Sequence, residues 1–212
     1  MKRTLAFAAS LLLLGACSSD GYTIRGKIAG LDNPYVYLLR YTGEVEVIDS
    51  AKVTKGDFVF KGKAEQPEVV YLSTDKQQPF VHFFLENGRI SVDGALSAPA
   101  DIAVLGTPSN DIQRAFDEQI AALEEEFAKA GNDMQRDSLR KEYSKLMSDA
   151  VEMNRDNIYG VTTFLNNAYA FLSPEEVMEQ IALFPAEWQQ RRELTELREA
   201  TERKLRVSAG HP

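Results

Sequence analysis

Thiols and imidazoles are scarce in this 212-residue sequence, which contains one cysteine, two histidines and one tryptophan. A single cysteine excludes an intrachain disulfide, a CxxC redox pair and a four-cysteine zinc site. Basic residues are also in deficit, because 24 Lys and Arg stand against 32 Asp and Glu, a formal net charge of −8. Phosphate binding needs a basic face, so this balance argues against a nucleic-acid partner. The remaining composition, 44% hydrophobic and 26% charged, is typical of a folded globular protein.

The first 16 residues have the pattern of a cleavable secretory signal. Lys2 and Arg3 form a short positive region, and the run from Leu5 to Leu14 is apolar. This run is too short to span a bilayer core, which needs about 20 residues. We therefore expect residues 1–16 to be a signal peptide that is removed from the mature chain.

The end of this signal, Leu14-Gly15-Ala16-Cys17, resembles the lipobox of bacterial lipoproteins. In that family the cysteine sulfur receives a diacylglyceryl group and the signal is cut before it. Several acyl chains anchor stably because each buried CH₂ contributes about 0.8 kcal/mol. We expect Cys17 to carry the lipid and residues 17–21 to form a tether. Serines follow the cysteine, which by resemblance to the Gram-negative sorting rule favours the outer membrane; an ordinary secretory signal is the alternative.

Between residues 22 and 106 the hydrophobic pattern has the period of β-strands. Tyr22, Ile24 and Ile28 alternate with polar residues, as expected of a strand with one face on a core. The segment Glu86-Asn87-Gly88 predicts a hairpin between the strands on either side of it. Further strands are expected near residues 35–40, 45–47, 58–60, 69–72, 80–85, 89–93 and 102–105. Short strands at this spacing predict an antiparallel β-sandwich or barrel.

From residue 107 to 206 the period changes to that of helices. One stripe runs from Ile112 to Phe127, and Ser173-Pro174-Glu175-Glu176 predicts a helix start with a capping box. Further helices are expected near residues 139–153, 161–171 and 187–205. The fold class is therefore α+β, with a sandwich- or barrel-like domain over residues 22–106 followed by a helical segment. We expect this segment to dock on the sheet, because its apolar stripes need a cover.

The candidate chemical residues are few. His82 lies on an expected strand, four residues before Glu86, so both side chains are expected on one face. Such a pair suits acid–base chemistry or a metal, but Phe80, Phe83 and Phe84 also fit a histidine at the edge of a core. Two ligands do not define a metal site, and no serine or glycine motif of a hydrolase or phosphate site is present. We predict no catalytic residue and no cofactor.

The β region is rich in aromatic residues. Those on the exposed face would stack on sugar rings or on a peptide, which makes a glycan- or peptide-binding lipoprotein one hypothesis. Alternation places most of them in the core instead. The aromatic residues concerned are Tyr35, Tyr37, Tyr41, Phe58, Phe60, Tyr71, Phe80, Phe83 and Phe84.

Several segments of the β region together resemble a known domain. They are Tyr22–Ile28, Val36–Leu38, Ile48–Val53, Gly56–Gly62, Phe83–Gly88 and Val104–Thr107 with Asn110. The pattern is similar to the N-terminal domain of unknown function that precedes the thioredoxin-like domain of TlpA/ResA-like thiol–disulfide oxidoreductase lipoproteins. Its motifs are structural turns and strands.

The resemblance implies a module that spaces a redox domain from the membrane, helps it to dimerise or presents it to substrates. The implied partners are an unknown envelope protein or a thioredoxin-like protein, with a homodimer as a further option. Residues 207–212 resemble the start of the junction to the thioredoxin domain, so a truncated or fragmentary disulfide reductase is an alternative. Thiol–disulfide exchange needs a free thiolate, and lipidation would consume Cys17. We therefore expect a non-catalytic, lipid-anchored module for interaction or positioning.

Overall fold

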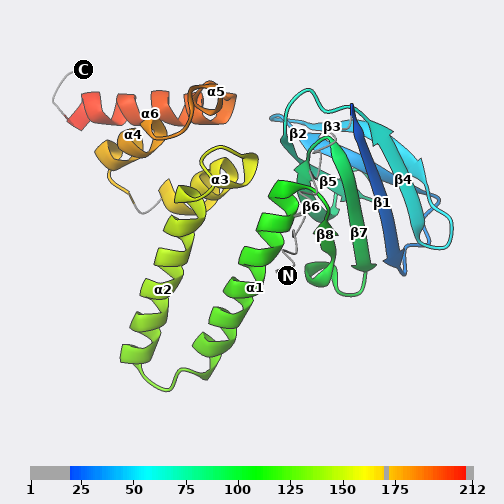
Figure 1. Ribbon diagram of the computed structural model, residues 1–212, viewed down its shortest axis with the longest axis horizontal. Helices are drawn as coiled ribbons and strands as arrows, with labels where there is room; N and C mark the ends of the chain where they lie inside the picture. The colour runs from blue at the N-terminus through cyan, green and yellow to red at the C-terminus, as the bar shows by residue number, and fades with distance from the viewer. Residues whose placement is uncertain (1–19, 170–171, 209–212) are drawn as a thin grey trace, which may run out of the picture.

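The computed structural model describes residues 20–169 and 172–208. The expected signal peptide, the expected lipid site Cys17 and the last residues of the expected junction, 209–212, lie outside these residues. Within the described part, eight strands are followed by a helical segment, which confirms the predicted α+β class (Figure 1). The strands are β1 Tyr22–Ala29, β2 Tyr35–Tyr41, β3 Val45–Lys52, β4 Asp57–Gly62, β5 Glu68–Ser73, β6 Pro79–Leu85, β7 Gly88–Ala95 and β8 Ala103–Leu105.

The strands form two four-stranded sheets, with the orders β4-β1-β7-β8 and β3-β2-β5-β6. The first sheet departs from the antiparallel expectation, because β1 and β7 pair in parallel, from Tyr22 opposite Gly88 to Ala29 opposite Ala95. The other strand pairs are antiparallel.

The predicted hairpin at Glu86-Asn87-Gly88 is wrong. Strands β6 and β7 lie in different sheets, so this segment crosses from one sheet to the other. The Asn87 side chain does not close a two-residue turn; its amide accepts from Ala64 N at 2.9 Å and donates to Ala64 O at 2.8 Å. Asn87 thereby fastens the crossing to the β4–β5 connection. The Asn-Gly signal predicted local backbone geometry correctly, since Gly88 has a positive φ of 151°, but not the pairing.

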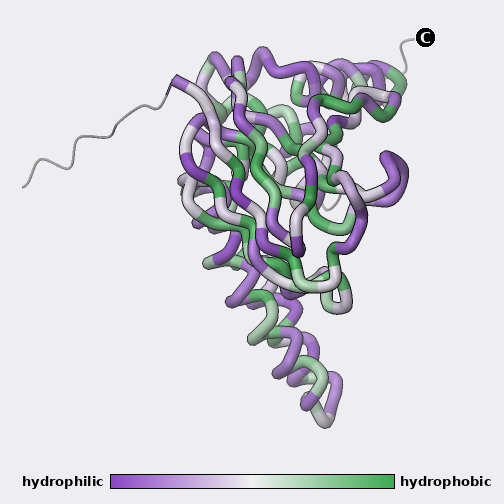
Figure 2. The backbone as a smooth tube through the Cα atoms, turned by 90° about the vertical axis from the view of Figure 1, so that its right-hand side faces the viewer, coloured by the Kyte–Doolittle hydropathy of each residue, from purple (hydrophilic) through white to green (hydrophobic). Residues whose placement is uncertain are grey.

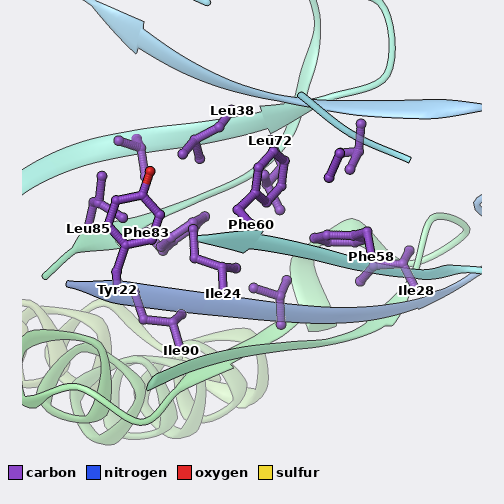
Figure 3. Close-up of a cluster of buried hydrophobic side chains, with 14 of the residues drawn as sticks. Tyr22, Ile24, Ile28, Leu38, Phe58, Phe60, Leu72, Phe83, Leu85 and Ile90 are labelled. Carbon is purple, nitrogen blue, oxygen red and sulfur yellow. The ribbon is translucent and has the colours of Figure 1, made fainter. Parts of the chain in front are cut away.

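The main core lies between the two sheets (Figure 3). Ile24, Phe60 and Ile90 of the first sheet meet Leu72 and Phe83 of the second, and each is at most 1% exposed. Burying a side chain of this size stabilises the fold by about 1.5 to 3 kcal/mol. Purple and green stretches follow one another along the strands of the sandwich in Figure 2. In β1 and β4 the burial alternates from residue to residue, as expected of strands with one face on the core.

Gly26 makes room for this core. It lies in the middle of β1, opposite Phe58 of β4. A Cβ atom at Gly26 would lie 1.9 Å from Cζ of Phe58. A glycine is therefore required here by the aromatic ring that lies over it, not by a turn.

The helical segment begins with a long antiparallel hairpin that extends beyond the sandwich (Figures 1 and 2). The helices are α1 Pro108–Lys129, α2 Asp133–Glu152, α3 Ile158–Thr163, α4 Pro174–Ala182, α5 Ala186–Gln189 and α6 Arg192–Ser208, with a π-helical turn, Phe164–Ala168, after α3. The predicted capping box is confirmed: Ser173 Oγ accepts from Glu176 N at 3.2 Å, and Ser173 N donates to Glu176 Oε2 at 2.7 Å. The helix expected over residues 187–205 is divided into α5 and α6.

The helical segment packs on the outer face of the second sheet. Phe84 of β6 points away from the main core and meets Tyr159 of α3 edge-on, with ring centroids 6.1 Å apart. Phe116 of α1 stacks on Tyr159 at 5.4 Å. Val69 and Ile158 complete this second apolar cluster. The outer face of this sheet is therefore covered by the helices around Val69 and Phe84, as the apolar stripes of the helices require.

Asn110, in the first turn of α1, holds the helix to the edge of this sheet. Its Oδ1 accepts from Phe84 N at 2.9 Å, and its Nδ2 donates to Phe84 O at 2.8 Å and to Thr107 Oγ1 at 2.7 Å. Strand β6 is the last strand of its sheet, so the side-chain amide of Asn110 occupies the place of a further strand. Asn110 is 2% exposed, and these bonds are shielded from water.

We predict that Asn110→Ala lowers the free energy of unfolding by about 2 to 4 kcal/mol, because the buried N–H and C=O of Phe84 lose their partners. Urea denaturation followed by circular dichroism measures this change. Asn33→Ala, at an exposed position in the β1–β2 loop, is the matched control and should change stability by less than about 0.5 kcal/mol. Equal effects of the two substitutions would contradict the assigned role.

Candidate functional site

His82 and Glu86 engage different partners. Strand β6 ends at Leu85, so the alternation that placed both side chains on one face no longer governs Glu86. The Glu86 carboxylate accepts from Ser109 N at 3.1 Å and from Ser109 Oγ at 2.7 Å, at the N-terminus of α1. A carboxylate in this place satisfies a free helix N–H and suits the positive end of the helix dipole. Glu86 therefore has a structural role.

His82 is exposed on the outer face of β6, in a row of aromatic rings. Its ring centroid lies 6.0 Å from that of Tyr71 on β5, and Tyr71 lies edge-on to Tyr41 of β2 at 4.7 Å. Burial, with a smaller contribution from Tyr41, raises the pKa of Tyr71 above its ordinary value. The phenol of Tyr71 is therefore neutral at physiological pH and can donate as well as accept a hydrogen bond.

This row forms one wall of a cleft of about 930 Å³ between the second sheet and the helical segment. Ile158 and Val161 of α3 and Arg191 before α6 form the opposite wall. The volume lies within the range of about 300 to 1,000 Å³ that is usual for small-molecule sites. The cleft arises where the helical cover of the sheet ends.

Two charged groups of the cleft, Arg40 and Glu68, are paired with each other. Arg40 donates through Nε to Glu68 Oε2 and through Nη2 to Glu68 Oε1 at 2.7 Å, and Nη1 lies 3.2 Å from Glu46 Oε2. The hydrogen bonds with Glu68 raise the pKa of Arg40 above its ordinary value. A bidentate Arg–carboxylate pair is oriented and fully ionised. These groups therefore supply fixed polar contacts and are poorly suited to proton transfer.

Arg191 fixes the helical wall of the cleft. Its Nη1 donates to Pro67 O, in the β4–β5 connection, at 2.8 Å. Its guanidinium lies over the ring of Trp188 at 5.4 Å, and its side chain is only 10% exposed. Arg191 thus ties the start of α6 to the sandwich, and it brings Trp188 close to the cleft.

A smaller pocket of about 350 Å³ lies on the other side of His82. Here α1 contributes Gln113, Arg114 and Asp117. Burial raises the pKa of the Asp117 carboxyl, against the lowering effects of a hydrogen bond from Gln113 and the charges of His82 and Arg114. Among residues 20–169 and 172–208, no three His, Cys, Asp or Glu side chains are grouped so that they could hold a metal ion.

The third hollow is an apolar groove between α1 and α2. We call it the hairpin groove, and it has a volume of about 920 Å³. Leu123 and Phe127 line it from α1, and Leu139, Tyr143 and Met147 line it from α2. None of the helices in the described part of the chain combines the length and apolarity needed to cross a membrane.

The sequence alone did not reveal the residues that shape the cleft. The aromatic composition of the β region predicted exposed tyrosines as ligand contacts, and Tyr41 and Tyr71 are placed accordingly. Arg191 was missed because its partner, the carbonyl of Pro67, lies 124 residues away and carries no side-chain signal. Asp117 was missed because its approach to His82 depends on how α1 docks.

We predict that Glu86→Ala destabilises the protein by about 1 to 2 kcal/mol, because the first turn of α1 loses its carboxylate partner. His82→Ala should change stability by less than about 0.5 kcal/mol, because His82 is exposed. Chemical denaturation of the two variants checks this difference. Equal destabilisation, or a rise in the melting temperature of the wild type on addition of Zn²⁺ that both variants lose, would instead favour a shared site.

Comparison with known families identifies the sandwich. Residues 22–113 match the family described as "Domain of unknown function (DUF4369)". No curated protein matches the chain. The matched segment runs past the strands and includes Ser109 and Asn110, the residues of α1 that bind Glu86 and Phe84. The chain therefore has a DUF4369 domain over residues 22–113, and the matched segment covers both sheets and the docked start of α1.

Proposed function

We propose that this chain is a lipid-anchored module of the cell envelope that binds or positions a partner and performs no chemistry itself. The cleft between the second sheet and the helices carries this proposal. Arg40 and Glu68 of the cleft hold each other in a pair, and its aromatic groups, Tyr41 and Tyr71, offer contact area. Such a surface favours recognition, since the paired Arg40 and Glu68 are not free to exchange a proton with a ligand.

The anchor in this proposal is the lipid on Cys17, at the outer membrane of a Gram-negative bacterium. Residues 17–21 would span at most about 18 Å when fully extended. The sandwich, which begins at Tyr22, would then stand close to the membrane surface. The acidic net charge of the chain supports anchoring by lipid alone, because anionic headgroups repel it.

The partner in this proposal is an unknown envelope protein or a thioredoxin-like protein. This follows from the resemblance of the Tyr22–Ile28 and Gly56–Gly62 segments to the domain that precedes the redox domain of TlpA/ResA-like lipoproteins. By analogy with those lipoproteins, this module would hold a thioredoxin-like domain at a distance from the membrane or present it to its substrates.

A second candidate function is the binding of a glycan or a peptide. The row formed by Tyr41, Tyr71 and His82 favours it, because aromatic rings at the wall of an open cleft stack on sugar rings and on peptide side chains. A ligand that contains both a sugar and a peptide would test the cleft most directly.

For the anchor, we predict that the wild-type chain incorporates labelled palmitate in cells and that Cys17→Ser abolishes incorporation. The reason is that Cys17 is the only thiol in the sequence. Autoradiography of the immunoprecipitated protein measures the label, and fractionation shows whether the variant leaves the membrane. Ser18→Ala is the matched control and should retain the label. Unchanged labelling of the Cys17→Ser protein would reject the anchor.

For the cleft, we predict that muropeptides released from peptidoglycan change the tryptophan emission of the protein. Trp188 is the only tryptophan, and it lies beside Arg191 at the cleft wall. Tyr71→Ala should weaken binding about tenfold, because stacking by one aromatic side chain contributes about 1.4 kcal/mol.

The matched control for this titration is Tyr35→Ala. Tyr35 is 47% exposed but does not line the cleft, so its removal should leave the affinity unchanged. Isothermal calorimetry with the same muropeptides provides a second readout that does not depend on Trp188. No emission change and no heat would exclude the glycan or peptide function and leave the partner-binding function as the proposal.

A further inference from the structure

We propose that the hairpin groove binds the hairpin of a second copy of this chain, so that two α1–α2 hairpins form a symmetric four-helix bundle. The proposal is independent of the cleft and of its ligand. It assigns a use to the part of the molecule that extends furthest from the sandwich (Figures 1 and 2).

The hairpin groove leaves large apolar side chains exposed to water. Phe127 and Tyr143 are each 38% exposed, although both face the groove. Within the described residues, the elements that border this face lie at its end near the sandwich, where α3 packs against α1 and α2, and where Phe164 and Gln180 line the groove. Two helices alone bury only a narrow seam, whereas four helices enclose a core.

The charges of the groove indicate that its occupant is a second copy. The α1 wall carries Glu124 and the α2 wall carries Arg140. A two-fold axis that runs along the groove, parallel to the helices, places α1 of one copy against α2 of the other, so Glu124 of each copy faces Arg140 of its partner. A self-complementary patch of this kind is what an isologous dimer requires. Within its own chain Arg140 lies over the ring of Phe127 at 5.6 Å, which places its guanidinium at the groove. Its ion pair with Asp137, at 2.6 Å, is exposed and weak.

The size of the face fits a weak, reversible dimer. Beyond the part of α1 that docks through Phe116, about 13 residues of the helix remain, so the face is about 20 Å long, and two helices side by side are about 20 Å wide. Pairing of two such faces covers about 400 Å² on each copy, or about 800 Å² in total, which is the size of a transient interface.

The first experiment measures the oligomeric state by sedimentation equilibrium, with the chain from residue 18 onward, which includes every residue that the structure describes. The wild type should be a dimer, and Phe127→Glu should raise the dimer dissociation constant tenfold or more, because it places a charge in the centre of the interface. Met134→Glu is the matched control: Met134 is 84% exposed and does not line the groove, so this variant should dimerise like the wild type. A monomeric wild type, or a dimer unaffected by Phe127→Glu, would overturn the proposal.

The second experiment tests the pairing itself and does not depend on an apolar substitution. Glu124→Arg and Arg140→Glu should each weaken self-association, because like charges then face one another across the axis. An equimolar mixture of the two variants should form heterodimers as stable as the wild-type dimer, detected by native mass spectrometry. A contact within one chain cannot be restored by mixing, so a mixture that remains monomeric would refute the two-fold pairing even if Phe127→Glu lost helical structure.

Discussion

The rest of the structure depends on one constraint, that strand β6 is apolar on both faces. Phe83 and Leu85 point into the sandwich, and Phe84, between them, points away from it. A sheet of this kind cannot leave its outer face in water. The helical segment must therefore cover it, and the stack of Phe84, Tyr159 and Phe116 provides that cover. Asn110 fixes the cover at the strand edge, where the backbone of Phe84 has no further strand to pair with.

The cleft lies where the helical segment stops covering the outer face of the second sheet. The helices reach Val69 and Phe84 but leave Tyr41, Tyr71 and His82 at their margin. A wall built from α3 and the start of α6 then faces a wall built from the sheet. Because Arg191 ties the helical wall to the carbonyl of Pro67, the width of the cleft is set by a contact between distant parts of the chain. Such preorganisation lowers the cost of ordering the site on binding.

Local features of this fold could be predicted from the sequence, and long-range ones could not. Alternation located the strands, the helical period located the helices, and Ser173 with Glu176 marked the start of α4. These signals act within a few residues. The parallel pairing of β1 with β7 and the order of the sheets depend on contacts between distant segments, and periodicity does not encode them. The segment Glu86-Asn87-Gly88 shows the difference, because Asn87 uses its amide to bind Ala64 instead of closing a hairpin. For the same reason the aromatic content of the β region did not locate the cleft, and the roles of Asn110 and Arg191 emerged only from the packing.

The hairpin contributes little to this packing, and that is the main reason to assign it a role in recognition. Its surface pairs, such as Lys129 with Glu125 and Lys145 with Asp149, contribute only about 0.3 to 0.5 kcal/mol each. Helices in proteins draw most of their stability from the apolar surface they bury, and beyond Phe116 the helix α1 buries only a narrow seam against α2. The sandwich does not need an arm of this length for its core, since the start of α1 already completes the cover of β6. The length of the arm and its exposed apolar face are therefore explained better by what the arm binds than by what it stabilises.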